Sequence, residues 1–168
     1  SGMAALASVV MTLARPGDNV VACNALYGGS FALLQRHLAD FDIETRFLPP
    51  TQSNVKKEIL SLIDGKTRLL YFETPANPTL DIVDISLWAS VAEANSVPLV
   101  VDNTFASTYL QKPLALGADI VIHSATKYLG GHGDIIGGII VGSRDKTLAV
   151  RDSYFNHFGP AMSQFNDW

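Results

Sequence analysis

The sequence is poor in cysteine and in charge of either sign. Cys23 is the single cysteine among 168 residues, which excludes an internal disulfide and is typical of a reducing compartment. Charged residues make up 17% of the chain and the net charge is −4, so electrostatics give no reason to expect nucleic acid or an anionic membrane as a partner. We therefore expect a cytoplasmic protein that binds neither nucleic acid nor membrane.

Long apolar runs and common nucleotide-binding motifs are also missing. No apolar stretch approaches the roughly 20 residues of a membrane-spanning helix, and no signal-peptide pattern is present. There is no Walker A sequence, and Gly130–Gly133 lacks the G-x-G-x-x-G dinucleotide pattern. The four histidines have no metal-ligand spacing, so we predict no metal site. We expect His123 to be a core residue and His132 to lie near the functional site.

The remaining composition favours one α/β domain. Hydrophobic residues make up 48% of the chain, enough for a sizeable buried core. Strand-like and helix-like segments alternate with short turn signals between them, which predicts a mostly parallel sheet flanked by helices. The expected strands span 19–23, 43–48, 68–73, 99–101, 119–123 and 135–141, and the expected helices span 3–14, 31–41, 54–63 and 85–94.

Polar residues gather where the expected strands stop. Pro75 and Pro78 forbid regular structure, so strand 68–73 runs into a shaped loop. In open α/β sheets, ligands bind outside the carboxyl ends of the strands. The sequence therefore predicts a ligand site at this edge of the sheet. Its expected residues are Glu73, Asn77, Asp102, Ser124, Thr126 and Lys127.

Two of these residues have both a structural and a functional interpretation. Asp102 either caps the next helix or binds backbone amides, or it is an anion that faces a cationic ring nitrogen. Lys127 is either a surface lysine or an amine that reaches an aldehyde carbon, while Ser124 and Thr126 donate to phosphate oxygens. The Asp-ended strand and the Ser-x-Thr-Lys strand end together favour a pyridoxal 5'-phosphate (PLP) site.

Six short motifs, in order along the chain, resemble the PLP-dependent enzymes of cysteine and methionine metabolism. This family includes methionine γ-lyase, cystathionine γ-lyase, cystathionine γ-synthase and homoserine sulfhydrylases. The resemblance covers essentially all 168 residues and implies the aspartate-aminotransferase-like large domain of fold type I. The motifs are Ser1–Ala5, Leu26–Gly29, Glu73–Pro78, Val101–Thr104, His123–Tyr128 and Gly131–Asp134.

The resemblance implies two catalytic residues, Lys127 and Tyr27. Lys127 would be the Schiff-base lysine that also moves protons between substrate carbons. Both roles require an amine whose charged ammonium form is destabilised by burial or by nearby charge. Tyr27 would stack on the pyridine ring and protonate the leaving group. The structural alternative for Tyr27 is a hydrophobic staple at the start of a helix.

The resemblance also implies how the cofactor is held. Backbone amides of Gly2 and Met3, at a helix N-terminus, would bind the PLP phosphate. Hydroxyl groups of Ser124 and Thr126 would bind the same phosphate. Asp102 would contact the ring nitrogen of the cofactor, and Asn77 would contact its phenolic oxygen. Glu73 would support the site.

The implied function is a transsulfuration-type reaction on a sulfur amino acid. The motifs most resemble the methionine γ-lyase branch, so the main hypothesis is γ-elimination of methionine or cystathionine by a C–S lyase. That branch carries a cysteine where this chain has Gly29, which weakens the assignment to methionine. One alternative is γ-replacement, by an O-acylhomoserine sulfhydrylase or cystathionine γ-synthase. An alternative of another class is a catalytically inactive α/β fragment.

Both ends of the sequence suggest an incomplete chain. Residue 1 falls directly on a helical pattern, and residues 162–168 stop within a further expected element. By the resemblance, residues 1–168 are the PLP-binding large domain without its N-terminal arm and C-terminal domain. The family also implies an amino-acid substrate and self-association into a dimer or tetramer.

Overall fold

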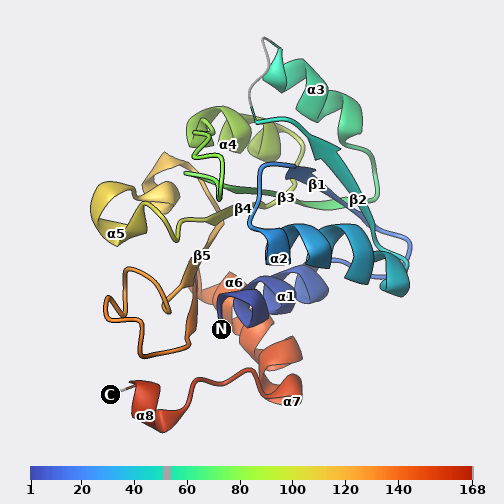
Figure 1. Cartoon of the computed structure of the whole chain (residues 1–168). Coiled ribbons are helices and arrows are strands. Elements are labelled where there is room, and N and C mark those ends of the chain that lie inside the picture. Colours follow the sequence, from blue (N-terminus) through green and yellow to red (C-terminus); the bar gives the residue numbers. More distant parts are fainter. Residues whose placement is uncertain (51–53, 168) are drawn as a thin grey trace.

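The computed structural model describes residues 1–50 and 54–167, which are arranged around a six-stranded sheet (Figure 1). The strands are β1 Asn19–Cys23, β2 Glu44–Leu48, β3 Thr67–Glu73, β4 Leu99–Asp102, β5 Ile120–Ser124 and β6 Gly138–Gly142. Their order across the sheet is β2-β1-β3-β4-β5-β6. Strands β1 to β5 run parallel and β6 pairs antiparallel with β5, which confirms the predicted mostly parallel sheet.

The inner strands are apolar because helices cover both faces of the sheet (Figure 1). All of β1 is buried, as is all of β3 except Arg68. The longer helices are α1 Gly2–Leu13, α3 Val55–Leu62, α4 Ile85–Ala94 and α6 Arg144–Val150. The shorter helical segments are α2 Gly28–Ala32, η1 Leu33–His37, η2 Ala39–Phe41, α5 Ser107–Leu110, η3 Pro113–Leu116, η4 Arg151–Phe155, α7 Asn156–Phe158 and α8 Gln164–Asp167. Within the described ranges, no helix is both long and apolar enough to cross a membrane.

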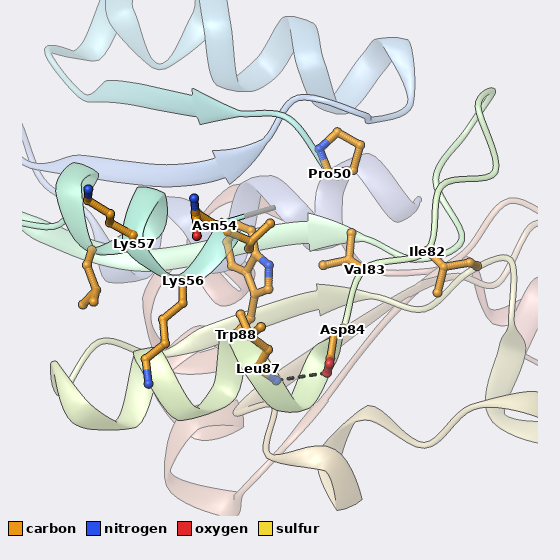
Figure 2. A pocket seen from close by; sticks show the side chains of 11 residues that line it. Pro50, Asn54, Lys56, Lys57, Ile82, Val83, Asp84, Leu87 and Trp88 are labelled. Carbon is orange, nitrogen blue, oxygen red and sulfur yellow. Dashed lines mark hydrogen bonds between the residues drawn. The ribbon is translucent and has the colours of Figure 1, made fainter. Parts of the chain in front are cut away.

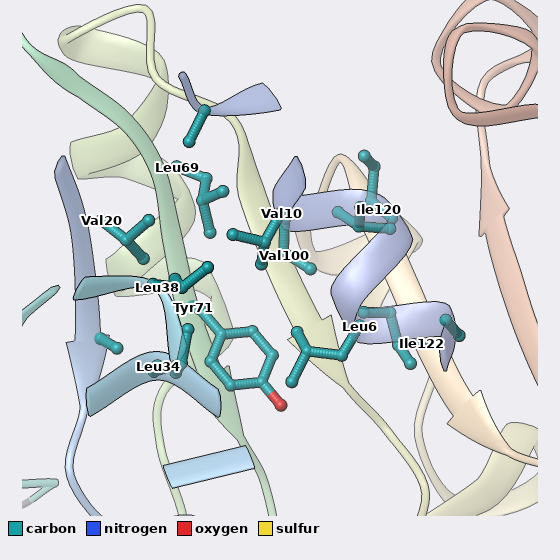
Figure 3. Packing of buried hydrophobic residues seen from close by; sticks show 14 of the residues in the cluster. Leu6, Val10, Val20, Leu34, Leu38, Leu69, Tyr71, Val100, Ile120 and Ile122 are labelled. Atoms are coloured by element: carbon teal, nitrogen blue, oxygen red, sulfur yellow. The ribbon is translucent and has the colours of Figure 1, made fainter. Parts of the chain in front are cut away.

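The core on the α1 face holds that helix against the middle of the sheet (Figure 3). Leu6 and Val10 are four residues apart and so lie on one side of α1, where both are buried. They belong to one cluster with Val100 of β4 and Tyr71 of β3. This packing places the first turn of α1 at the carboxyl ends of the central strands.

The opposite face of the sheet is covered by α3 and α4. Trp88 of α4 is buried and packs edge-on against Phe72 of β3, with ring centroids 5.0 Å apart. Ile59 of α3 joins the same cluster. Because Tyr71 and Phe72 are adjacent in β3, they point to opposite faces and contribute to different cores.

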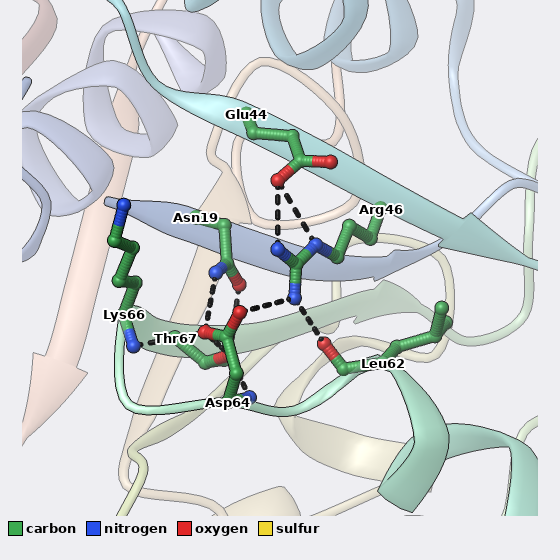
Figure 4. Close-up of polar contacts among 7 residues, drawn as sticks. All are labelled: Asn19, Glu44, Arg46, Leu62, Asp64, Lys66 and Thr67. Carbon is green, nitrogen blue, oxygen red and sulfur yellow. Dashed lines mark hydrogen bonds and ion pairs between the residues drawn. The ribbon is translucent and has the colours of Figure 1, made fainter. Parts of the chain in front are cut away.

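A polar network joins the starts of β1 and β3 at the amino edge of the sheet (Figure 4). Asn19 Nδ2 donates to Asp64 Oδ1 at 2.8 Å, and Thr67 Oγ1 donates to Asn19 Oδ1 at 2.8 Å. Arg46 donates to Asp64 Oδ2 at 2.8 Å and to the Leu62 carbonyl at 2.9 Å. These polar groups satisfy one another, so this edge is held by structural contacts.

Most predicted elements are confirmed, with two corrections. Strand 19–23 and helix 85–94 have the predicted limits. The helix predicted at 31–41 begins at Gly28 and continues through a π-helical turn and a 3-10 turn. The strand predicted at 135–141 begins only at Gly138, because the Ala125 N–H and the Thr126 hydroxyl engage the backbone of Gly137.

Several other features of the chain were not predicted or differ in detail from the prediction. The helical segments α5, η3, α6 and η4 follow weak or mixed patterns that gave no expectation. In the first half, Asn54 occupies the expected cap position of α3, but its side chain makes no capping hydrogen bond. The predicted element near the C-terminus corresponds to α8, while Trp168 lies outside the described residues.

Candidate active site

A pocket of about 200 Å³ lies at the carboxyl ends of β3, β4 and β5. All nine residues predicted to hold PLP line it, although they come from segments up to 125 positions apart, as with Gly2 and Lys127. Parallel strands bring their carboxyl ends to one edge, which is why these segments meet. The predicted residues are Gly2, Met3, Tyr27, Glu73, Asn77, Asp102, Ser124, Thr126 and Lys127.

The first turn of α1 lies directly against the end of β5. A Cβ atom added to Gly2 would come within 2.7 Å of Ser124 Cβ, so this close approach requires glycine. The side chain of Ser1 caps the helix by accepting from the Ala4 N–H at 3.2 Å. The amides of Gly2 and Met3 are among those that a helix leaves without intrahelical acceptors. They are therefore donors at the pocket.

Asp102 is held by Thr104, which was not among the predicted site residues. Asp102 Oδ1 accepts from the Thr104 N–H at 2.9 Å and from the Thr104 hydroxyl. Thr104 Oγ1 in turn accepts from the Ser124 N–H at 2.9 Å, which ties β4 to β5. Asp102 Oδ2 has no hydrogen-bond partner in residues 1–50 and 54–167. One oxygen thus fills the structural role, and the other is available for a ligand.

The pKa of the Asp102 carboxyl is set by opposing effects. Burial raises this pKa, and the two hydrogen bonds from Thr104 lower it, with a net shift upward. A cation placed at the pocket would favour the ionised form of Asp102. A threonine two residues after a strand-ending aspartate is an Asx-turn pattern, and this signal identifies Thr104.

Thr126 and Lys127 lie in a turn immediately after β5. The Thr126 hydroxyl accepts from the Gly137 N–H at 3.1 Å, so it has a backbone partner in addition to any ligand. The turn is closed by the Gly130 N–H, which donates to the Ala125 carbonyl at 2.8 Å. Lys127 is exposed, because it projects from this turn and not from the buried strand, which leaves nearby charge as the remaining one of the two expected influences on its amine.

Glu73 is buried at the end of β3, with 6% of its surface exposed. Its Oε2 accepts from the Tyr27 N–H at 2.8 Å, and its Oε1 accepts from the Tyr71 hydroxyl at 3.4 Å. Burial first, and then the negative charge of Asp102, raise the pKa of Glu73 to about 7. Tyr71, which was expected only as a residue of strand 68–73, is therefore part of the site.

Tyr27 stands at the entrance to the pocket, immediately before α2. Its side chain is half exposed, which does not fit the alternative of a buried hydrophobic staple. A Cβ atom at Gly29 would lie 2.6 Å from Tyr27 Cε1 and 3.1 Å from Met3 Sδ. Glycine at position 29 therefore allows the Tyr27 ring to occupy its place beside Met3.

Neither histidine near this edge belongs to the pocket. His123 is buried, as predicted, and its Nδ1 has no partner among the described residues. His132 is exposed and its Nδ1 lies 3.0 Å from the Gly130 carbonyl oxygen. In the described part of the chain, no group of three or more His, Cys, Asp or Glu residues could hold a metal ion.

A larger pocket of about 870 Å³ lies between α3 and α4, on the other face of the sheet (Figure 2). Its lining is mainly apolar and includes Leu60, Val83 and Trp88, with Lys56 and Lys57 at its margin. It contains none of the predicted site residues. Volume alone therefore does not identify the functional site, whereas convergent polar groups do.

The fold and the smaller pocket together define a class of protein, the fold type I PLP-dependent enzymes. A mostly parallel sheet presents a lysine, a half-buried aspartate, hydroxyl groups and a helix N-terminus at one edge. The chain belongs to the family of Cys/Met metabolism PLP-dependent enzymes, whose model matches residues 1–168. The predicted family, fold class and cofactor are therefore confirmed.

Known relatives are considerably longer than this chain. The L-methionine gamma-lyase of Pseudomonas putida is 46% identical over 151 residues, covering 90% of this chain and 37% of that protein. The cystathionine gamma-lyase of Bacillus subtilis is 46% identical over 141 residues, covering 84% and 36% respectively. The crystal structure of cystathionine gamma-lyase from Lactobacillus plantarum complexed with L-serine has a TM-score of 0.90 and 38% identity, covering 100% and 43%. The chain thus spans about two fifths of these relatives.

The residues at the pocket fit PLP. Gly2 lets the first turn of α1, with its free N–H donors, lie directly against Ser124, which an added Cβ would prevent. Asp102 Oδ2 suits a cationic ring nitrogen, and Lys127 supplies an amine for an aldehyde carbon. The pocket thus combines donors for an anion, an acceptor for a cation and a nucleophile.

Proposed function

We propose that the intact protein is a PLP-dependent C–S lyase that eliminates the γ-substituent of methionine or cystathionine. The observation that carries this proposal is the convergence of Lys127, Asp102 and Tyr27 on one pocket with the first turn of α1. The methionine and cystathionine gamma-lyases among the relatives support the same reaction class.

Lys127 and Asp102 have the central roles in this proposal. When bound, PLP supplies an electron sink for charge that develops on the substrate. The Nζ atom of Lys127 would hold the cofactor, and when free of it the same amine would take and return protons at the substrate carbons. Asp102 Oδ2 binds the ring nitrogen and keeps it protonated, while Thr104 holds the carboxylate through Oδ1.

The phosphate is bound by the first turn of α1 and the end of β5. The N–H groups of Gly2 and Met3 donate to phosphate oxygens, where the helix dipole also favours an anion. The hydroxyl of Ser124 donates to the same group. Thr126 contributes less directly, because its hydroxyl also donates to the Gly137 carbonyl at 3.4 Å.

Tyr27, Asn77 and Glu73 complete the site. The Tyr27 ring would stack on the cofactor, and its phenol would protonate the departing sulfur. Asn77 donates to the phenolic oxygen of the cofactor from the loop after β3. This loop is held in shape by Thr74, whose Oγ1 accepts from the Val83 N–H at 3.0 Å. Glu73 supports Tyr27 by accepting a hydrogen bond from the Tyr27 backbone N–H.

The proposed enzyme acts on an amino acid and associates with copies of itself as a dimer or tetramer. Large apolar side chains on α5 support association, because Tyr109 is 89% exposed and Leu110 is 76% exposed. Sedimentation equilibrium measures the assembly directly. A strictly monomeric protein at high concentration would contradict this part of the proposal.

The first test is covalent attachment of PLP. We expect borohydride to fix PLP to the purified protein, and mass spectrometry of its peptides to locate the added mass on Lys127. Lys127→Ala should abolish the attachment. Lys66→Ala is the matched control, because Lys66 is an exposed lysine beside the polar network at the opposite edge of the sheet. Attachment elsewhere, or none, would refute the proposed site.

The second test concerns the reaction. Incubation with PLP and either methionine or cystathionine should release a thiol and ammonia without any added nucleophile. Thiol release that requires an added thiol and is not accompanied by ammonia would indicate γ-replacement. A protein that binds PLP at Lys127 but releases neither product would contradict the lyase proposal while leaving the PLP site intact.

A further inference from the structure

Glu73 has a position that its supporting role alone does not explain. It is almost fully buried, yet its carboxyl group contacts no cation among the described residues. It accepts hydrogen bonds from the Tyr27 N–H and the Tyr71 hydroxyl. A buried carboxylate without a cation is unfavourable, so its charge responds strongly to the surroundings.

The principal electrostatic neighbour of Glu73 is Asp102. The two residues are register partners at the ends of β3 and β4, so their side chains project to the same face and line the same pocket. Glu73 is buried and Asp102 is half-buried, and two carboxylates at such adjacent positions disfavour simultaneous ionisation. A cation bound to Asp102 offsets this repulsion and favours the ionised form of Glu73.

The other groups that face Glu73 do not remove this coupling. Tyr71 donates from the same strand, and burial together with the charges of Glu73 and Asp102 holds its pKa well above the usual range. Lys127 lines the pocket from the turn after β5, but it is exposed. From α1, Met3 and Leu6 present apolar side chains to the pocket.

We propose that Glu73 is a positioning residue that links the charge on Asp102 to the placement of Tyr27. The inference rests on the proposed function, in which Asp102 binds the ring nitrogen and Tyr27 stacks on the ring. An ionised Glu73 accepts a strong, charge-assisted hydrogen bond from the Tyr27 N–H, and a protonated Glu73 accepts a weaker one. Binding of a cationic ring at Asp102 thereby strengthens the attachment of the stacking residue.

The amide signal of Tyr27 tests this link directly. Selective ¹⁵N labelling of tyrosine yields one amide signal for each of the five tyrosines, and Tyr27→Phe identifies the signal of interest. In the wild-type protein without PLP, we expect this signal to titrate with a midpoint near pH 7. In Glu73→Gln, which keeps an acceptor oxygen, the signal should remain but no longer titrate over this range.

The dependence on Asp102 is tested in the same experiment. Asp102→Asn removes the repulsion, so the Tyr27 midpoint should move to lower pH by about one unit, while Glu93→Gln on the exposed side of α4 should leave it unchanged. The inference would be overturned by a Tyr27 signal that does not titrate, or by one that titrates equally in Glu73→Gln. A titration midpoint that is the same in Asp102→Asn as in the wild type would also overturn it.

This result is separable from the test of the proposed function. The titration needs no PLP, and its wild-type arm does not depend on the folding of any variant. Failure of PLP to attach to Lys127 would overturn the proposed function without altering the titration. A protein that attaches PLP at Lys127 but has a non-titrating Tyr27 amide would overturn only the link through Glu73.

Discussion

Replacing Glu73 with glutamine should change how the stability of this protein depends on pH. Burial and the neighbouring Asp102 raise the pKa of Glu73 from 4.5 to about 7. A carboxyl group with a raised pKa in the folded state contributes stability that is fully present below its unfolded pKa and is lost as the pH rises through the folded pKa. The difference of about 2.5 between the two values corresponds to about 3 kcal/mol, lost between about pH 4.5 and pH 7.

Urea unfolding at a series of pH values measures this effect. Between pH 5 and pH 8, the free energy of unfolding of the wild-type protein should fall by up to about 3 kcal/mol more than that of Glu73→Gln. Glutamine retains an oxygen that accepts from the Tyr27 N–H, so the fold should persist. Glu93→Gln, an exposed control, should behave like the wild type. Equal pH dependence in Glu73→Gln and the wild type would refute the argument that burial and Asp102 raise this pKa.

Three further predictions concern packing and reactivity. Gly29→Ala should force the Tyr27 ring back by about 1 Å and weaken PLP binding about tenfold with little change in the urea midpoint; unchanged affinity would contradict a restricted ring. Leu69→Ala, in the fully buried part of β3, should lower the free energy of unfolding by about 2–5 kcal/mol, whereas the exposed Leu60→Ala should change it by about 0.5 kcal/mol; similar losses would refute the assigned core. Cys23 is buried and its pKa is raised to about 11, chiefly by burial, so a thiol reagent at pH 8 should react only as the protein unfolds; rapid reaction of the native protein would contradict its burial.

Local patterns were sufficient to predict much of the fold. The apolar runs at 19–23 and 99–101 and the amphipathic pattern at 85–94 correspond closely to β1, β4 and α4. Strand 135–141 was placed too early because the contacts that delay β6 join Gly137 to the turn after β5, and no local pattern reports them. The segments α5 and α6 were missed because their patterns resemble those of loops.

The composition of the candidate site was also predictable, but its internal contacts were not. Glu73, Asp102 and Lys127 follow apolar strands, and the carboxyl ends of parallel strands share an edge, so these residues were expected to meet. Their proposed roles toward PLP stay predictions. Tyr71 was missed because its contribution depends on a hydrogen bond to a side chain of this edge, whereas Thr104 follows Asp102 in a local Asx-turn pattern that could have identified it.

The sequence by itself determined the α/β class, because apolar periodicity is a property of neighbouring residues, and its short motifs carried the resemblance to the Cys/Met metabolism PLP-dependent family. Only the tertiary structure decided that β3 lies between β1 and β4, which places Glu73 beside Asp102 and within reach of the Tyr27 amide. It also decided that the first turn of α1 approaches Ser124 so closely that residue 2 must be glycine. Strand order and helix docking depend on packing between distant segments, and the charge of a buried carboxyl group depends on the neighbours that this packing supplies.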